Sequence, residues 1–197
     1  MKISAVILAG GESRRMGRDK AEIVFKDKRT IDIMAEKLRS FDEIFISADK
    51  TYEADGCKNI SDIYKGKGPA AGILSALKEM KADALFVTAC DMPLIKEETV
   101  QNMCGEYLKN GSNFDAAVLK INDRINPLFA VYGKNTADVF EEAILCGELS
   151  VKKIIDKMKV YSVDYEKITD NDKEFLNMNT ADDCKIVEKV YYENGFK

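Results

Sequence analysis

The chain has 197 residues, a length that fits one domain, and its 46% hydrophobic and 32% charged residues are an ordinary balance for a soluble globular protein. The formal net charge of -4 argues against a general nucleic-acid-binding protein, because such proteins are normally basic. The sequence contains no histidine, which excludes a Ser-His-Asp triad, a zinc site built on histidine, and histidine as a general base.

The five cysteines are scattered along the chain, without a Cys-x-x-Cys pair. This pattern favours reduced thiols over a disulfide framework or a metal knuckle, so we expect a cytoplasmic protein. We also expect no signal peptide and no association with a membrane, because no apolar run approaches the length that spans a bilayer.

The first predicted element is a buried strand over residues 3–8, a short apolar run rich in β-branched side chains. It ends at a glycine turn, where main-chain N–H groups can approach a ligand closely. Polar and cationic side chains follow in the next nine residues: Ser13, Arg14, Arg15, Arg18 and Lys20. Such a turn with four cations suits a polyphosphate, although a solvated basic surface loop would have the same composition. The spacing fits neither a Walker loop nor the dinucleotide-binding glycine pattern.

The segments between this loop and residue 83 alternate between helical and extended patterns. In order, they are an extended piece at 22–25, a helix over 31–41, a strand at 43–47, a polar loop at 49–59, an extended segment at 60–63, and a helix that begins at Pro69. The segment at 60–63 carries Asp62, and a second glycine turn with two lysines follows it. That turn is compatible with an anion site and equally with an ordinary strand-to-helix connection.

The most strongly buried strand is predicted at 84–89, where the continuous apolar run is typical of a central parallel strand. It leads into Cys-Asp-Met-Pro at 90–93. Ligands of open α/β sheets bind beyond the carboxyl ends of the strands, so we expect Asp91 at the same edge as Gly10. A carboxylate there can hold Mg²⁺, which prefers oxygen ligands and shares its shell with substrate phosphates. The alternative is an ordinary turn aspartate.

The second half of the chain continues the alternation. It contains a predicted helix at 97–108, a strand at 116–120, a turn at 122–124, a strand at 128–132, a helix at 136–145, a helix from a Ser150 cap through Met158, and a strand at 160–163. After a charged connector, Thr180 is predicted to cap the last helix with Asp183 as its acidic partner. Asn177 and Asn179 would then be either site residues or part of a polar turn.

This alternation predicts an α/β fold of three layers, with a mostly parallel sheet and helices on both faces. Right-handed crossovers would place the loops at 9–20, 62–69 and 90–93 at one edge of that sheet. We expect residues 1–197 to form a single domain.

A basic glycine loop and a metal carboxylate suit chemistry at phosphorus, which needs phosphates held in line and their charge offset. We expect Arg15 and Lys20 to hold the β- and γ-phosphates of a nucleotide, together with the amides of Gly10 and Gly11. Mg²⁺ on Asp91 would bridge the α-phosphate and the leaving pyrophosphate. The nucleophile would be a phosphate oxygen of the second substrate, already ionised near neutral pH, so no general base is required.

The stretch Leu-Ala-Gly-Gly-x-Ser-x-Arg-Met-Gly-x-Asp-Lys at 8–20 resembles the signature of the molybdenum cofactor guanylyltransferases, the MobA family of Rossmann-like nucleotidyltransferases. The resemblance covers nearly the whole chain. Its further motifs are Asp62 with Gly-Pro-Ala-Ala-Gly at 68–72, Cys-Asp-Met-Pro at 90–93, the segment at 124–132 in which a basic residue precedes Pro-Leu-x-Ala, and Asn-Met-Asn-Thr at 177–180. Departures from the family pattern occur at Ser47, Ala70 and Ala181.

The resemblance also implies roles for individual residues. The implied nucleotide-binding positions are Leu8, Ala9, Gly10, Lys20, Asp62 and Asp91, to which the amide argument above adds Gly11, and Asp91 would also bind Mg²⁺. The implied acceptor positions are Arg124, Asn177 and Asn179. The nucleotide half would be about residues 1–95 and the acceptor half about 96–197.

The implied reaction joins GMP from GTP to the terminal phosphate of molybdenum-bound molybdopterin, forming the guanine dinucleotide cofactor and pyrophosphate. Proteins that deliver the molybdenum cofactor would be possible partners. Close relatives use CTP on the same acceptor or on sugar and polyol phosphates, and a nucleotide-binding module without turnover is a further alternative. The complete motif, with Gly-Gly at 10–11 and Arg-Met-Gly-x-Asp-Lys at 15–20, favours guanylyl transfer.

Overall fold

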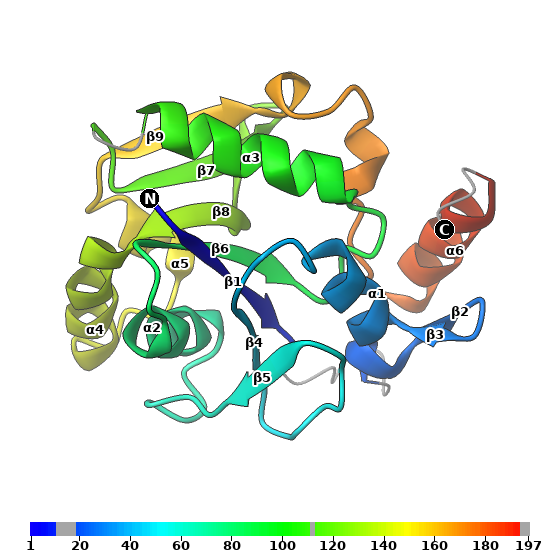
Figure 1. The fold of residues 1–197 in the computed structure, drawn as a ribbon, viewed down its shortest axis with the longest axis horizontal. Helices are drawn as coiled ribbons and strands as arrows, with labels where there is room; N and C mark the ends of the chain where they lie inside the picture. The colour runs from blue at the N-terminus through cyan, green and yellow to red at the C-terminus, as the bar shows by residue number, and fades with distance from the viewer. Residues whose placement is uncertain (11–18, 111–112, 194–197) are drawn as a thin grey trace.

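In the described part of the chain, seven strands form the main sheet, which runs through the middle of the molecule in Figure 1. The structure is a computed structural model that describes residues 1–10, 19–110 and 113–193. In spatial order the strands are β5 (Cys57–Ile60), β4 (Ile44–Ser47), β1 (Ile3–Leu8), β6 (Ala84–Ala89), β8 (Arg124–Gly133), β7 (Ala116–Ile121) and β9 (Val160–Asp164). Both halves of the chain therefore contribute to one sheet.

The central strands β1 and β6 are apolar and almost fully buried, as the sequence predicts. β1 pairs in parallel with β4 on one side and with β6 on the other, so Leu8 lies between Ser47 and Ala89. Four of the six described pairings in this sheet are parallel, and β8 runs antiparallel to both of its neighbours. The predicted mostly parallel sheet is confirmed, and the carboxyl ends of β1, β4 and β6 meet at one edge.

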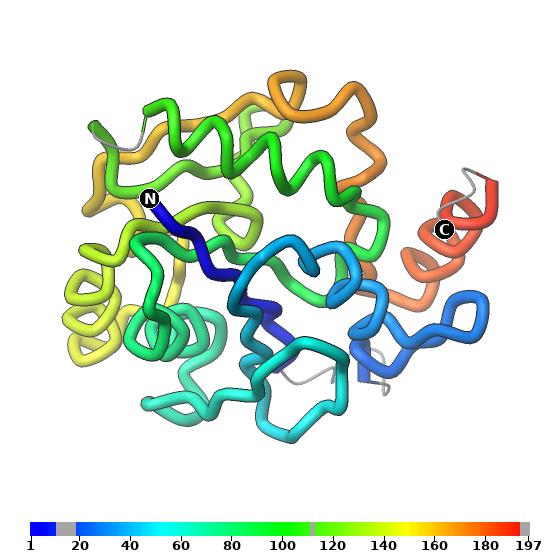
Figure 2. Tube along the Cα trace, viewed as in Figure 1, coloured from blue at the N-terminus to red at the C-terminus, as the bar shows by residue number. Residues whose placement is uncertain are grey.

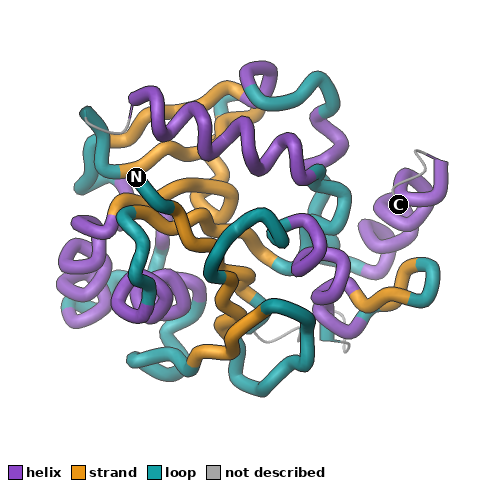
Figure 3. Tube along the Cα trace, viewed as in Figure 1, coloured by secondary structure: helices purple, strands orange, loops and turns teal. Residues whose placement is uncertain are grey.

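Helices cover both faces of the sheet, so the predicted three-layer α/β fold is confirmed; Figure 3 shows the orange strands between the purple helices. On one face, α1 (Thr30–Lys37) and α3 (Glu97–Asn110) share a core with Phe86 of β6. On the other face lie α2 (Pro69–Glu79), α4 (Ala137–Leu145) and α5 (Val151–Ile155). None of the described helices is both long and apolar enough to cross a bilayer.

The last helix, α6 (Ala181–Glu193), packs on a small hairpin from the beginning of the chain. The hairpin pairs β2 (Val24–Phe25) with β3 (Lys28–Arg29) and follows the 3₁₀ turn η1 (Lys20–Glu22). Figure 2 shows the red helix beside the blue hairpin. The extended piece expected at 22–25 is thus shorter than predicted, because Glu22 belongs to η1. The C-terminal segment is held next to the turn that carries Lys20.

Edge strand β5 corrects the sequence prediction for this region. The segment 49–59 was expected to be a loop and 60–63 to be extended, but Cys57–Ile60 forms the strand, in parallel with β4. Lys58 and Asn59 give the segment no apolar alternation, so its pairing depends on the neighbouring strand and not on its own pattern. The Asn59 side chain also holds the backbone of Tyr52, with hydrogen bonds of 2.8 and 2.9 Å.

Strand β8 begins earlier than predicted, at Arg124 instead of residue 128. The two residues before it, Asn122 and Asp123, have positive φ angles of 46° and 60°, as a tight two-residue hairpin turn requires. The pairing of β7 with β8 shifts between Val118 and Leu119, which moves Pro127 out of the regular ladder. The proline therefore interrupts the register without ending the strand.

Helix α5 ends at Ile155, before the predicted end at Met158. Ser150 occupies the predicted N-cap position, but its side chain makes no capping hydrogen bond there. A helix of this length receives little from its own backbone, so the burial of Ile154 and Ile155 against the sheet stabilises it instead.

A buried carboxylate, Glu174, fastens the connector before α6 to the start of α3. It is fully buried and accepts hydrogen bonds from the hydroxyls of Thr99 at 2.6 Å and Thr169 at 2.8 Å, while Lys96 Nζ lies 3.2 Å away. Replacing Glu174 with alanine leaves these donors without their acceptor. We expect the free energy of unfolding to fall by about 2–3 kcal/mol.

Urea denaturation of the Glu174→Ala variant measures this change, with Glu142→Ala on the exposed side of α4 as the control. The control should stay within about 0.5 kcal/mol of the wild type. A Glu174→Ala variant as stable as the control would contradict the structural role of this carboxylate.

Candidate functional site

The carboxyl ends of β1, β4 and β6 come together at one edge of the sheet. The backbone N–H of Ala9 donates to the carbonyl of Ser47 at 2.9 Å, and the N–H of Cys90 donates to the carbonyl of Leu8 at 3.1 Å. These bonds join the ends of three strands. The predicted meeting of these strand ends at one edge is therefore confirmed for the described residues.

Lys20, Asp91 and Asn179 form a cluster at this edge. Lys20 Nζ lies 3.0 Å from Asp91 Oδ2 and donates a hydrogen bond to Asn179 Oδ1 at 2.9 Å. The Lys20 and Asp91 side chains are only 20% and 18% exposed, so water screens the ion pair less than it would on the open surface. Three segments that are far apart in the sequence thus meet on one ammonium group. A phosphate entering here would compete with Asp91 for that group.

The position of Asn179 is fixed by the segment around it. The backbone N–H of Met178 donates to the carbonyl of Asp91 at 3.0 Å, which fastens this segment to the turn after β6. Thr180 and Asp183 form the predicted capping pair: the Asp183 N–H donates to Thr180 Oγ1 at 3.1 Å, and the Thr180 N–H donates to Asp183 Oδ2 at 2.8 Å. The cap holds the beginning of α6, and with it the amide of Asn179, beside Lys20.

Asp62 lies near the same edge, after β5, and is linked to the end of β4. The Ser47 hydroxyl donates to Asp62 Oδ1 at 2.8 Å. Burial raises the pKa of Asp62 above its ordinary value, the Ser47 hydrogen bond partly opposes that rise, and Asp49 adds to it. Sequence reasoning singled out both residues but did not foresee that they pair.

Gly72 of α2 packs directly against this pair, and we expect Gly72→Ala to destabilise the protein. A Cβ at this position would lie 2.8 Å from Leu8 Cδ2 and would overlap the Ser47 hydroxyl. Overpacking of this kind typically costs about 1–3 kcal/mol, more than the helix propensity of alanine returns. Thermal and urea denaturation measure the change, with Gly105→Ala as the control because a Cβ there meets no atom within 4 Å. Equal stability of the two variants would contradict this packing.

The described residues test only one part of the predicted phosphate contact at the glycine turn, the part that concerns Gly10. The N–H of Gly10 donates to the carbonyl of Ser47 at 3.1 Å, so in this structure it is not directed at a ligand. The predicted contact of the Gly10 N–H with a phosphate is therefore not supported, because this N–H already donates to the carbonyl at the end of β4. Gly11 and Arg15 lie outside the described residues.

Two predicted acceptor residues are not joined to the cluster. Within the described ranges, no hydrogen bond or ion pair connects Arg124 or Asn177 to Lys20 or Asp91. Arg124 is exposed at the beginning of β8. Asn126, which the sequence marked only as the residue before a proline, donates to Sδ of Met92, the residue after Asp91, at 3.7 Å.

The donor chemistry near Asp91 fits a magnesium ion that is completed by its substrate. Among the described residues, no group of three or more Asp, Glu, Cys or His side chains is gathered as a metal site. Mg²⁺ nevertheless commonly binds through one or two carboxylates together with substrate phosphates and water. Asp91 presents one carboxylate at the edge where the strand ends meet, which meets that requirement.

The chain is similar to one family along most of its length. Residues 5–161 match the family described as the MobA-like NTP transferase domain. A Clostridium perfringens protein named "Probable molybdenum cofactor guanylyltransferase" is 34% identical, with 96% of this chain and 98% of that protein aligned. The solved structure of molybdopterin-guanine dinucleotide biosynthesis protein A from Archaeoglobus fulgidus is 30% identical, with a TM-score of 0.84 over 96% of this chain and 99% of that one.

A more distant structure supports the fold alone. CMP:2-keto-3-deoxy-manno-octonic acid synthetase complexed with CTP is 13% identical, with a TM-score of 0.74 over 98% of this chain and 100% of that one. Together, the near and distant structures confirm the predicted Rossmann-like nucleotidyltransferase architecture.

Proposed function

Because the chain belongs to the MobA-like NTP transferase domain family, we propose that it transfers GMP from GTP to the terminal phosphate of molybdenum-bound molybdopterin. The products are the guanine dinucleotide cofactor and pyrophosphate. The names of the relatives support the nucleotide and the acceptor. The observation that carries the proposal is the position of Lys20 Nζ, which lies between the Asp91 carboxylate and the Asn179 amide at the carboxyl edge of the sheet.

In the proposed reaction, a phosphate oxygen of molybdopterin forms the new bond to the α-phosphorus of GTP, and the bond to the leaving pyrophosphate breaks. The attacking oxygen is ionised near neutral pH, so the chain needs no general base, in keeping with its lack of histidine. The ammonium of Lys20 offsets the negative charge that develops on the phosphates. Asp91 would hold Mg²⁺, which when bound neutralises phosphate charge as a Lewis acid.

The two halves of the site have different proposed roles. Asp62, Lys20 and Asp91 come from the part of the chain proposed to bind the nucleotide, whereas Asn179 comes from the part proposed to bind the acceptor. Because Lys20 Nζ contacts Asn179, the ammonium lies where the two substrates would meet. We further propose that proteins which deliver the molybdenum cofactor are partners of this chain. We also propose a cytoplasmic location, because the five cysteines are free thiols.

Pyrophosphate release from GTP and molybdopterin, with and without Mg²⁺, tests the proposal. We expect release only when both substrates and Mg²⁺ are present, and a dinucleotide product detectable by mass spectrometry. Parallel reactions with CTP, and with sugar phosphates as acceptors, test the alternatives. Tight GTP binding without product would indicate a nucleotide-binding module instead, and turnover with CTP alone would overturn the choice of base.

A further inference from the structure

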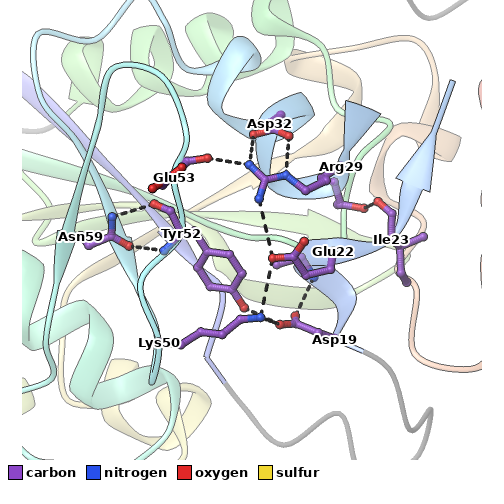
Figure 4. Close-up of polar contacts among 11 residues, drawn as sticks. Asp19, Glu22, Ile23, Arg29, Asp32, Lys50, Tyr52, Glu53 and Asn59 are labelled. Carbon is purple, nitrogen blue, oxygen red and sulfur yellow. Dashed lines mark hydrogen bonds and ion pairs between the residues drawn. The ribbon is translucent and has the colours of Figure 1, made fainter. Parts of the chain in front are cut away.

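A polar network links the loop after β4 to the turn that carries Lys20 (Figure 4). The Tyr52 hydroxyl donates to Asp19 Oδ2 at 2.7 Å, and Lys50 Nζ lies 2.8 Å from the same oxygen. The other carboxylate oxygen, Asp19 Oδ1, accepts from the backbone N–H of Ala21 at 3.0 Å and so caps η1. One carboxylate therefore joins the loop to the turn.

The tyrosine at the centre of this network has little freedom to move. Tyr52 is only 3% exposed, and the Asn59 side chain pairs with both backbone polar groups of Tyr52. Lys50 Nζ also lies 4.8 Å from the centroid of the Tyr52 ring, within the range of a cation–π contact. The hydroxyl is thus presented to Asp19 from a fixed position.

Asp19 is held in its ionised form. Burial alone would raise the pKa of Asp19, but the hydrogen bonds from Lys50 and Tyr52 outweigh it and leave the pKa below its ordinary value. The carboxylate is therefore negatively charged at neutral pH. Hydrogen bonds to a charged acceptor are stronger than those between neutral groups, which favours a rigid link.

A second set of contacts supports the first (Figure 4). Arg29 forms a bidentate pair with Asp32 at 2.7 and 2.8 Å and donates to the carbonyl of Glu53 at 2.5 Å. Its guanidinium also lies 3.7 Å from Glu22, which in turn lies 3.6 Å from Lys50 Nζ. The loop is thus connected to both ends of η1 and to the beginning of α1.

We propose that Tyr52 and Lys50 are positioning residues that hold Lys20 in place for the phosphates by fixing Asp19 and the turn that it caps. A lysine side chain is long and flexible, so the place of its ammonium depends on how firmly its backbone is held. Asp19 is the residue directly before Lys20, and the network fixes that backbone from outside the cluster. The inference rests on the proposed role of Lys20 in binding phosphate.

A double-mutant cycle between Tyr52→Phe and Lys20→Ala tests the proposal. Tyr52→Phe removes one hydroxyl and keeps the buried ring. We expect it to lower kcat/KM about tenfold when Lys20 is present, as the loss of a hydrogen bond to a charged group would. In the Lys20→Ala background the same change should have almost no effect, because the group that it positions is gone. An equal loss in both backgrounds, or no loss with Lys20 present, would overturn the inference.

Tyr161→Phe is the matched control, because Tyr161 also lies between a lysine and a carboxylate. Tyr161 belongs to β9. Its hydroxyl donates to Glu106 at 3.1 Å and accepts from Lys167 at 2.9 Å. We expect kcat/KM of this variant to stay within twofold of the wild type. Lys50→Met provides a second variant that does not threaten folding, since the Lys50 side chain is 53% exposed, and it should lower kcat/KM in the same Lys20-dependent way.

The same double-mutant cycle can be measured without turnover, by calorimetry of the binding of inorganic triphosphate to each variant. We expect Tyr52→Phe to weaken this binding several-fold only when Lys20 is present. If the wild type binds triphosphate through Lys20 but converts no nucleotide, the proposed function is wrong. The affinities of the four proteins for triphosphate then still show whether Tyr52 positions Lys20. If the wild-type protein does not bind triphosphate, the positioning role is also overturned.

Discussion

The Lys20→Ala variant is expected to lose about 10²–10³-fold in kcat, the range found when one preorganised charge-stabilising group is removed. The Lys20 side chain is only 20% exposed, and its ammonium already contacts Asp91 and Asn179 at this edge. It therefore needs little reorganisation to offset charge on a phosphate. Alanine removes that charge and the ion pair of Lys20 with Asp91.

Initial rates of pyrophosphate release measure this loss, with Lys185→Ala as the control. Lys185 is an exposed lysine on α6 that pairs with Asp182 and lies outside the cluster. Its removal should leave kcat within twofold of the wild type. A Lys20→Ala variant with nearly normal turnover and an unchanged melting temperature would refute the assignment of Lys20.

The Asp91→Asn variant is expected to show a loss of similar size, together with a need for more Mg²⁺. Asparagine keeps the shape of the side chain but removes the negative charge, and a neutral amide is a weaker ligand for a hard cation. The change also removes the ion partner of Lys20. A titration of the rate with Mg²⁺ separates the two roles, because only loss of a metal ligand moves the midpoint of that curve.

Asp83→Asn is the control for this second variant, because Asp83 directly precedes β6 and Asp91 follows the same strand. Asp83 accepts from the backbone N–H of Lys2 at 2.8 Å, at the opposite end of the strand from the site. We expect its replacement to change neither the rate nor the Mg²⁺ midpoint by more than twofold. If Asp91→Asn slows the reaction but leaves the midpoint unchanged, Asp91 acts through Lys20 and the metal role is wrong.

Local patterns predicted the elements whose own residues decide their structure. The continuous apolar run of β6 and the cap formed by Thr180 and Asp183 were both found where the sequence placed them. The pattern failed at β5, whose polar residues are extended because β4 lies beside them. It also failed at Pro127, where the shift in register with β7 accommodates the proline inside β8.

For the candidate site, the sequence singled out Lys20, Asp91 and Asn179 individually, and placed Asp91 at the carboxyl edge of a central strand. It did not predict that one ammonium would contact the other two side chains, nor that the Gly10 N–H would bond to Ser47. The network around Asp19 and Tyr52 was missed as well, because the loop that carries Tyr52 has no periodic pattern.

The sequence by itself determined which chemical groups this protein has: cations and carboxylates of the types that can bind phosphate and magnesium, no histidine for acid–base catalysis, and the strand and helix pattern of an α/β sheet. These properties depend on residue type and local spacing. Only the tertiary structure decided which of these groups meet, because Lys20 and Asn179 are 159 residues apart and are brought together by the packing of α6 on the β2–β3 hairpin. Contacts between residues so far apart in the sequence depend on how the elements pack, and local propensity does not predict that packing.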